Sequence, residues 1–204
     1  MAFRVRKILI VSDSHGKSEN IKKAIDREKP DMLLHLGDIE ADTEEVRRWL
    51  GEAIPAIFLR GNCDDYGNDN LRKTSVFELN GHRFYCTHGH SIGVSVGLGN
   101  LICCAIENKC DIALFGHTHV PVDVEAGAGQ KYEENENDNV DEKYKEDEND
   151  NVDEEYKEDE DNKGISLRIL NPGSISLPRG GSNRGYMVMT FDEEENYTVK
   201  RKDL

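Results

Sequence analysis

The sequence has no long apolar run near its start. Behind Arg4, Arg6 and Lys7 the first apolar stretch covers only Ile8–Val11, which is too short for the core of a signal peptide or for a membrane span. Cysteine is also scarce, with five residues and no Cys-x-x-Cys pair of the kind that binds structural zinc. Unpaired thiols suit a reducing compartment. We therefore expect a cytoplasmic protein without a membrane segment.

Positive charge is in short supply. The chain has 26 basic and 41 acidic residues, a formal net charge of −15. Residues 131–163 hold 17 of the acidic residues and 5 of the basic ones, a balance of −12 that leaves −3 for the rest. Proteins that bind nucleic acid through its phosphates usually carry a basic surface. Long nucleic acid is therefore not an expected partner.

The acidic segment is an internal repeat in which tyrosine recurs every 12 residues, at Tyr132, Tyr144 and Tyr156. Dense like charge with few apolar side chains buries too little surface to offset the entropy of an ordered chain. We expect one domain over residues 1–204, with the repeat as a low-complexity insertion at about 126–164. The insertion would occupy the loop between strands expected at Val120–Glu125 and Ile165–Leu170.

The rest of the chain alternates between expected strands and helices. Three short apolar stretches are typical of parallel strands in βαβ units: Lys7–Ser12, Met32–Leu36 and Ala56–Leu59. Asn80-Gly81 predicts a hairpin. Further strands are expected at Ile112–Phe115 and, as antiparallel strands, at Leu167–Leu170, Tyr186–Phe191 and Tyr197–Lys200. This order favours a mixed α/β sandwich of two sheets with outer helices.

Polar side chains gather directly after five of the expected strands. They are Asp13, His15, Asp38, Asn62, Asp64, His88, His117 and His119. The carboxyl ends of strands in open α/β sheets form the ligand crevice, so these loops can converge on one edge. Each residue also has a structural interpretation, because aspartate caps helices and asparagine favours turns. Their joint placement favours a site.

Carboxylates together with imidazoles suit divalent ions such as Mn²⁺, Zn²⁺, Fe²⁺ or Ni²⁺. Two such ions about 3.5–4 Å apart lower the pKa of a bridging water and clamp a phosphoryl group for in-line attack. This chemistry needs no protein nucleophile. The sequence accordingly has no Gly-x-x-x-x-Gly-Lys-Ser/Thr phosphate loop.

In this order the motifs resemble the signature of the calcineurin-like metallophosphoesterase superfamily: Asp13-x-His15, Gly37-Asp38, Gly61-Asn62-x-Asp64, His88 and Gly116-His117-x-His119. The fuller motif Gly61-Asn62-Cys63-Asp64 is similar to that of its small single-domain phosphodiesterase branch, as is Asn171-Pro172-Gly173-Ser174-Ile175. The likeness covers the chain apart from the acidic insertion. It implies a four-layer α/β/β/α sandwich of two mixed β-sheets flanked by helices.

The resemblance also implies a metal-dependent phosphodiesterase with a dinuclear site. One ion would be held by Asp13, His15 and His119, the second by Asn62, His88 and His117, and Asp38 would bridge both. A bridging hydroxide would attack phosphorus. Mn²⁺ is the expected metal, with Ni²⁺, Zn²⁺ and Fe²⁺ as alternatives. A homodimer and a small phosphodiester substrate are further implications.

Three residues are candidates for catalysis: Asn62, which can steady a phosphate oxygen, His90, which can act as an acid–base group, and Asp64. Cys63 departs from the Gly-Asn-His-Asp/Glu pattern of many relatives, whose histidine can protonate the leaving group. A thiol is a poor general acid for an alkoxide, so we expect a preference for diesters over monoesters. Arg179 lies in a glycine-rich loop, where it either contacts phosphate or is simply exposed.

Two other functions remain open from the sequence. A catalytically weak scaffold for protein–protein assembly can keep this fold, although all seven ligand positions are present here. A nuclease would need a basic surface along the path of the phosphates, which this composition does not favour.

Overall fold

The structure is a computed structural model that describes residues 4–64, 71–126 and 166–204. In chain order its elements are β1 (Lys7–Val11), α1 (Ser18–Glu28), β2 (Met32–His35), α2 (Thr43–Leu50), β3 (Ala56–Phe58), β4 (Thr74–Leu79), β5 (His82–Thr87), the 3₁₀ turn η1 (His90–Ile92), α3 (Gly99–Glu107), β6 (Ile112–Leu114), β7 (Val122–Ala126), β8 (Leu167–Asn171), β9 (Gly185–Phe191) and β10 (Tyr197–Asp203). None of the described helices is both long enough and apolar enough to span a membrane.

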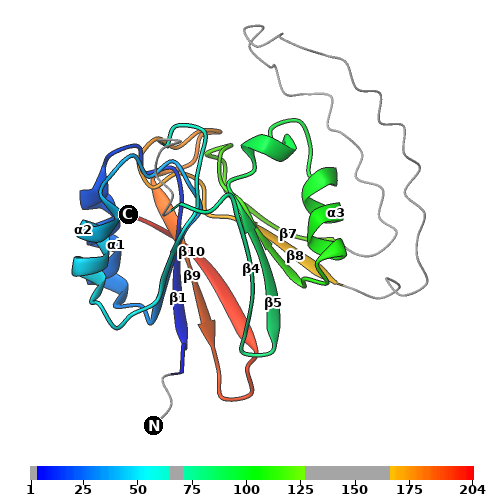
Figure 1. The fold of residues 1–204 in the computed structure, drawn as a ribbon, viewed down its shortest axis with the longest axis horizontal. Coiled ribbons are helices and arrows are strands. Elements are labelled where there is room, and N and C mark those ends of the chain that lie inside the picture. Colours follow the sequence, from blue (N-terminus) through cyan, green and yellow to red (C-terminus); the bar gives the residue numbers. More distant parts are fainter. Residues whose placement is uncertain (1–3, 65–70, 127–165) are drawn as a thin grey trace, which may run out of the picture.

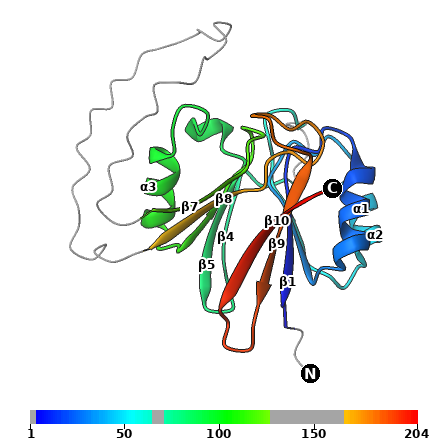
Figure 2. The same ribbon diagram turned by 180° about the vertical axis from the view of Figure 1, so that it is seen from behind.

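The described strands form two mixed five-stranded sheets. The first has the order β10-β9-β1-β2-β3, with β1, β2 and β3 parallel and β9 and β10 antiparallel. The second has the order β4-β5-β6-β8-β7, with parallel pairing across β5, β6 and β8. Helices α1 and α2 lie outside the first sheet and α3 lies outside the second (Figures 1 and 2). The predicted four-layer sandwich of two mixed sheets is confirmed.

Three apolar clusters hold the four layers together. Strand β1 shows how one short sequence serves two of them, because successive side chains of a strand point to opposite faces. Ile8 and Ile10 pack between the two sheets, whereas Leu9 and Val11 pack under α1 and α2. A third cluster joins α3 to the second sheet. Because β1 is buried on both faces, its sequence is continuously apolar rather than alternating.

The sequences of α1 and α2 explain where α2 begins and which face of α1 is buried. Asp42 caps α2, and its carboxylate accepts a hydrogen bond from the Glu44 amide at 2.9 Å. Ile21, Ala24 and Ile25 form the buried stripe of α1. Both helices therefore lie flat on the first sheet.

One strand pairing differs from the prediction. Of the three late strands predicted to be antiparallel, β9 and β10 are antiparallel, but β8 pairs in parallel with β6 and antiparallel with β7. The apolar residues of β8 predict a buried strand. They do not predict which strands lie next to it, because strand pairing depends on contacts between segments distant in the sequence. Strand β8 thereby lies between β6 and the edge strand β7.

The predicted acidic insertion at about 126–164 lies outside the described residues, except at its first position. The strands on either side of it, β7 and β8, are neighbours in the second sheet and run antiparallel. Ala126 is the register partner of Leu167, so the chain leaves and re-enters the sheet at one point. A hairpin of this kind can be closed by a short turn.

We expect a variant in which a short glycine-containing turn replaces residues 127–165 to fold and to keep its activity. The entropic cost of closing a loop falls by about 0.6 kcal/mol for each halving of its length, so about three halvings should raise the free energy of unfolding by up to about 2 kcal/mol. Urea unfolding measures this, and a variant with a Gly/Ser segment of the original length separates the effect of length from that of sequence. Loss of cooperative unfolding in the shortened variant would refute the interpretation of this segment as an insertion.

Candidate metal centre

The loops that follow five strands meet at one edge of the two sheets. Main-chain hydrogen bonds join them beyond the ends of the strands. The amide of Asp13 donates to the carbonyl of Gly37 at 3.0 Å, and the amide of His15 donates to that of Asp38 at 3.0 Å. In the second sheet the amide of Gly116 donates to the carbonyl of His88 at 3.1 Å. These links bring the polar side chains together, as the sequence predicts.

Five of the predicted ligands have left-handed backbone geometry, with φ between 45° and 68°: Asp13, His15, Asp38, His117 and His119. Residues with a β-carbon adopt this region infrequently, although aspartate and histidine tolerate it better than most. The left-handed turn redirects the chain immediately after the strand. As a result, the side chains project toward the shared edge instead of continuing along the strands.

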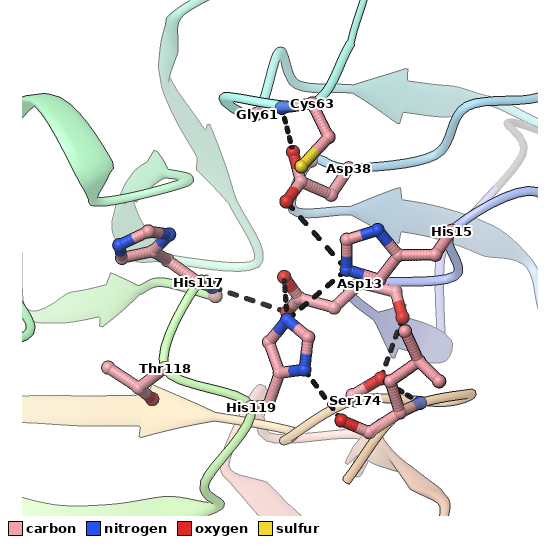
Figure 3. Close-up of polar contacts among 12 residues, drawn as sticks. Asp13, His15, Asp38, Gly61, Cys63, His117, Thr118, His119 and Ser174 are labelled. Atoms are coloured by element: carbon pink, nitrogen blue, oxygen red, sulfur yellow. Dashed lines mark hydrogen bonds and ion pairs between the residues drawn. The ribbon is translucent and has the colours of Figure 1, made fainter. Parts of the chain in front are cut away.

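The first group of potential ligand atoms comes from Asp13, His15 and His119, which Figure 3 shows facing one another. The two Nε2 atoms of His15 and His119 lie 3.2 Å apart, and Nε2 of His119 lies 3.3 Å from Oδ1 of Asp13. The opposite ring atoms are already bonded: Nδ1 of His15 to Oε2 of Glu40 at 2.7 Å, and Nδ1 of His119 to the carbonyl of Leu177 at 2.6 Å.

This bonding assigns the proton of each neutral ring to Nδ1, because a carboxylate or carbonyl oxygen only accepts. Both Nε2 atoms then present lone pairs to the same point, where they repel each other. Oδ1 of Asp13 lies beside them, fully buried and without a hydrogen-bond donor. A buried carboxylate oxygen and two facing lone pairs are stable around a cation, so these residues fit a divalent metal ion.

The second group lies around Asp38 and His88. Nδ1 of His88 donates to the carbonyl of Leu36 at 2.8 Å, which leaves Nε2 at 3.4 Å from Oδ2 of Asp38 and 3.1 Å from Oδ1 of Asn62. Asp38 Oδ1 accepts the Cys63 amide at 2.8 Å. Its Oδ2 is also 3.8 Å from Nε2 of His15. The free oxygen of Asp38 therefore stands between the two groups.

Burial and charge shift the protonation of this second group. Burial disfavours the ionised form of Asp38, but the hydrogen bond and charge of His88 outweigh it and hold the pKa of that carboxyl well below its usual value. Burial likewise opposes the charge of His88, yet Asp38 and Asp13 raise the pKa of His88 above its usual value. The surroundings of Asp38 thus favour positive charge, which a metal ion can supply.

Two glycines let the loops approach this closely. Gly37 has φ +106°, and a β-carbon there would lie 2.6 Å from Nδ1 of His88. A β-carbon at Gly61 would collide with the carboxylate of Asp38. Only a residue without a side chain fits at either position.

The structure places His117 beside His88 and outside the first group of potential ligands. Figure 3 shows its ring turned away from Asp13 and His119. The ring is 5.2 Å from that of His88 and 6.2 Å from that of His90, centroid to centroid. Burial and the charge of His88 lower the pKa of His117 to about 4, so its ring is neutral. Within the described part of the chain, no close group of three potential ligand atoms includes His117.

The candidate catalytic residues fall in three different settings. Asn62 is exposed at the mouth of the second group. His90 begins η1 and lies beside His88, and its Nδ1 is buried without a hydrogen-bond partner. Burial and the charge of His88 lower the pKa of His90. Both residues can therefore act on a molecule bound at the two groups.

Asp64 has a structural setting instead of a catalytic one. Its side chain is buried, and its two oxygens accept four main-chain amides. The Asp38 and Gly61 amides donate to Oδ2 at 2.8 and 2.7 Å, and the Ile39 and Glu40 amides donate to Oδ1 at 2.9 Å each. With both oxygens occupied, Asp64 clamps the turn that carries Asp38. These contacts favour a positioning role for Asp64, and its direct part in the chemistry stays a prediction.

Some features of the site are not visible in the sequence. Nothing in the spacing indicates that Glu40 would bond His15, or that main-chain carbonyls would bond the rings of His88 and His119.

The thiol of Cys63 also lies within reach of His15 and Asp38, as a third close group of potential ligand atoms. Its environment, burial first and then Asp38, raises the pKa of that thiol to about 12. The side chain of Arg179 is exposed, while its amide bonds the carbonyl of His119 at 3.2 Å.

Comparison with known proteins identifies a family for this chain. The profile of the calcineurin-like phosphoesterase superfamily domain matches residues 7–194. The chain is 26% identical over 189 residues to "Probable metallophosphoesterase YsnB" of Bacillus subtilis, covering 92% of this chain and 85% of that protein. It is 23% identical over 207 residues to "Phosphodiesterase YfcE" of Escherichia coli, covering 91% and 88%.

Two solved structures have the same fold. The structure of YfcE from Escherichia coli aligns with a TM-score of 0.55 at 20% identity, covering 96% of this chain and 98% of that one. Vps29 of Entamoeba histolytica, solved in complex with Zn²⁺, aligns with a TM-score of 0.60 at 16% identity, covering 97% and 98%.

Proposed function

Because the chain belongs to the calcineurin-like phosphoesterase superfamily, we propose that it is a metal-dependent phosphodiesterase acting on a small phosphodiester. The observation that carries the proposal is the pair of histidine Nε2 atoms 3.2 Å apart, with the free oxygen of Asp38 between them and His88. That arrangement turns ring nitrogens and carboxylate oxygens toward one place, where a cation can bind all of them. It favours catalysis over a purely structural role for the same residues.

In this proposal the two groups of ligand atoms hold two divalent ions. Asp13, His15 and His119 bind one ion, and Asn62 and His88 bind the other, with His117 as its further ligand according to the family pattern. Asp38 would be shared by both ions. We propose Mn²⁺ as the working metal, since mixed oxygen and nitrogen ligands suit borderline ions.

When bound, the two ions supply a hydroxide nucleophile at neutral pH and neutralise charge on the phosphoryl oxygens. The protein's own residues orient the substrate and exclude water from it. Asn62, exposed at the mouth, is placed to donate its amide to a phosphate oxygen. The neutral ring of His90 lies beside His88, where it can accept a proton from the attacking oxygen and, once protonated, give it to the departing oxygen.

Cys63 accounts for the proposed preference for diesters. With a pKa of about 12 in the metal-free protein, its thiol is a weak acid and gives little help to a departing alkoxide. The side chain is exposed beside Asp38 and therefore faces the phosphate position. Diesters with a good leaving group need no such acid, whereas monoesters of alcohols do.

We expect the Cys63→His variant to gain phosphomonoesterase activity. An imidazole at this position supplies a proton donor with a pKa near neutrality, and general acid catalysis contributes about 10²–10⁴-fold. The measurement is kcat/KM on a phosphomonoester of an alcohol, with Cys63→Ser as the control that removes the thiol without adding an acid. Equal monoester rates in the two variants would refute the leaving-group argument.

The proposed function itself is tested with bis-p-nitrophenyl phosphate. Protein stripped with a chelator is titrated with Mn²⁺, and p-nitrophenyl phosphate is assayed alongside. We expect diester hydrolysis only when metal is present, with the monoester slower. A chelator-stripped protein that hydrolyses the diester as fast as the Mn²⁺-loaded one would contradict the proposal.

A second candidate function is a protein-binding scaffold with weak catalysis. The likeness in fold to Vps29 is the observation behind it, because that protein's name refers to vacuolar protein sorting and its structure was solved with Zn²⁺. The discriminating result is metal binding without turnover. If the protein binds Mn²⁺, Ni²⁺ or Zn²⁺ and hydrolyses no diester with any of them, the scaffold becomes the better interpretation.

A further inference from the structure

Three histidines of the site have Nδ1 bonded to an acceptor, but the acceptors differ in kind. His88 donates to the carbonyl of Leu36 and His119 to the carbonyl of Leu177. These partners are main-chain atoms, which no substitution removes. His15 instead bonds the side chain of Glu40, with Nδ1 and Oε2 2.7 Å apart. The orientation of His15 therefore depends on one replaceable carboxylate.

We propose that Glu40 is a positioning residue that holds the proton of His15 on Nδ1 and so keeps Nε2 ready for a metal ion, a role that rests on the proposed function. A neutral imidazole in water prefers to carry its proton on Nε2, which is the atom needed here as a ligand. A carboxylate beside Nδ1 reverses this preference because it accepts a hydrogen bond and cannot donate one. It also fixes the plane of the ring and raises the basicity of the opposite nitrogen.

Glu40 does not act as a ligand itself. Its carboxylate lies against the Nδ1 edge of the His15 ring, whereas the potential ligand atoms gather at the Nε2 edge. Among the described residues, none of the close groups of three potential ligand atoms contains Glu40. Its contribution therefore passes through His15.

The backbone of Glu40 is held tightly although its side chain is 39% exposed. Its amide donates to Oδ1 of Asp64 at 2.9 Å, and its φ of +46° turns the chain toward the loop of His15. The Gly16 amide donates to the carbonyl of Ile39 at 3.0 Å and ties the same turn to that loop. One turn thus carries both Asp38 and the partner of His15, and Asp64 fastens it.

The test compares Glu40→Ala, Glu40→Gln and the control Glu44→Ala, which removes an equal charge from an exposed position in the first turn of α2. The first readout is the tautomer of His15, measured by ¹⁵N NMR in the metal-free protein. We expect the proton on Nδ1 in the wild type, in Glu40→Gln and in Glu44→Ala, and on Nε2 in Glu40→Ala. Glutamine rescues because its carbonyl oxygen can accept the same hydrogen bond.

The second readout is the affinity for Mn²⁺ alone, measured by calorimetry. We expect Glu40→Ala to weaken binding of one ion by about 10–100-fold, the usual effect of losing the partner of a metal-bound histidine. The proposal is overturned if His15 keeps its proton on Nδ1 in Glu40→Ala, or if that variant binds Mn²⁺ as tightly as Glu44→Ala. Neither readout requires turnover. If Glu40→Ala shows both changes but the wild-type protein hydrolyses no diester, the proposed function is refuted and the positioning role of Glu40 is still supported.

Discussion

Replacing Asp38 with asparagine is expected to abolish diester hydrolysis, with a fall in kcat of more than about 10³-fold. Oδ2 of Asp38 lies 3.8 Å from Nε2 of His15 and 3.4 Å from Nε2 of His88, so it is shared by both groups of ligand atoms. Asparagine can still accept the Cys63 amide through its carbonyl oxygen. It then turns an uncharged amide group toward the position that a cation would occupy.

The measurement is kcat on bis-p-nitrophenyl phosphate together with the number of Mn²⁺ ions bound per chain. His90→Ala is the informative comparison because it leaves both groups of ligand atoms intact, and we expect it to lose less activity than Asp38→Asn. Asp26→Asn serves as the matched control, since Asp26 is an exposed aspartate paired with Lys22 on α1. Near-normal turnover of Asp38→Asn would mean that Asp38 bridges nothing.

Replacing Asp64 with alanine should be the most damaging change to stability. Four main-chain amides lose their acceptor at once, and the site is buried, because Asp64 is only 4% exposed. Each buried donor left unpaired costs about 1–3 kcal/mol, and water entering the gap recovers part of it. We expect the free energy of unfolding to fall by about 3–5 kcal/mol, a large share of the total for a domain of this size.

Urea unfolding followed by the fluorescence of the single tryptophan, Trp49, measures this loss. Asp26→Ala is the control and should change stability by no more than about 0.5 kcal/mol, as exposed i,i+4 pairs do. Asp64→Asn should also be destabilising, because its amide group would face amides that need an acceptor. An unchanged urea midpoint for Asp64→Ala would show that the four hydrogen bonds contribute little.

The parts of the site that could be predicted are those that follow from strand order. A polar residue just past a buried parallel strand lies at the carboxyl edge of its sheet wherever the strand sits, so Asp13, Asp38 and His88 could be brought together without knowing the sheet. The same reasoning placed His119 correctly. It needs only the local periodicity of the sequence and the common direction of the strands.

What could not be predicted depends on rotamers and on contacts between distant segments. The ring of His117 lies beside those of His88 and His90 and turns away from Asp13 and His119, because χ angles decide where a long side chain ends. Asp64 resembles a catalytic carboxylate in the sequence, but the path of the turn around Asp38 saturates it. The parallel pairing of β8 with β6 likewise reflects packing that no local pattern encodes.

The left-handed backbone at five of the predicted ligands has a consequence for how this protein can change under selection. Holding residues with a β-carbon in that region costs about 1 kcal/mol each, and glycine or asparagine would relieve much of it. A laboratory selection for heat resistance alone would therefore tend to erase the site before it touched the core. A descendant freed from phosphate chemistry should drift toward glycine or asparagine there, whereas this chain keeps aspartate or histidine at all five positions.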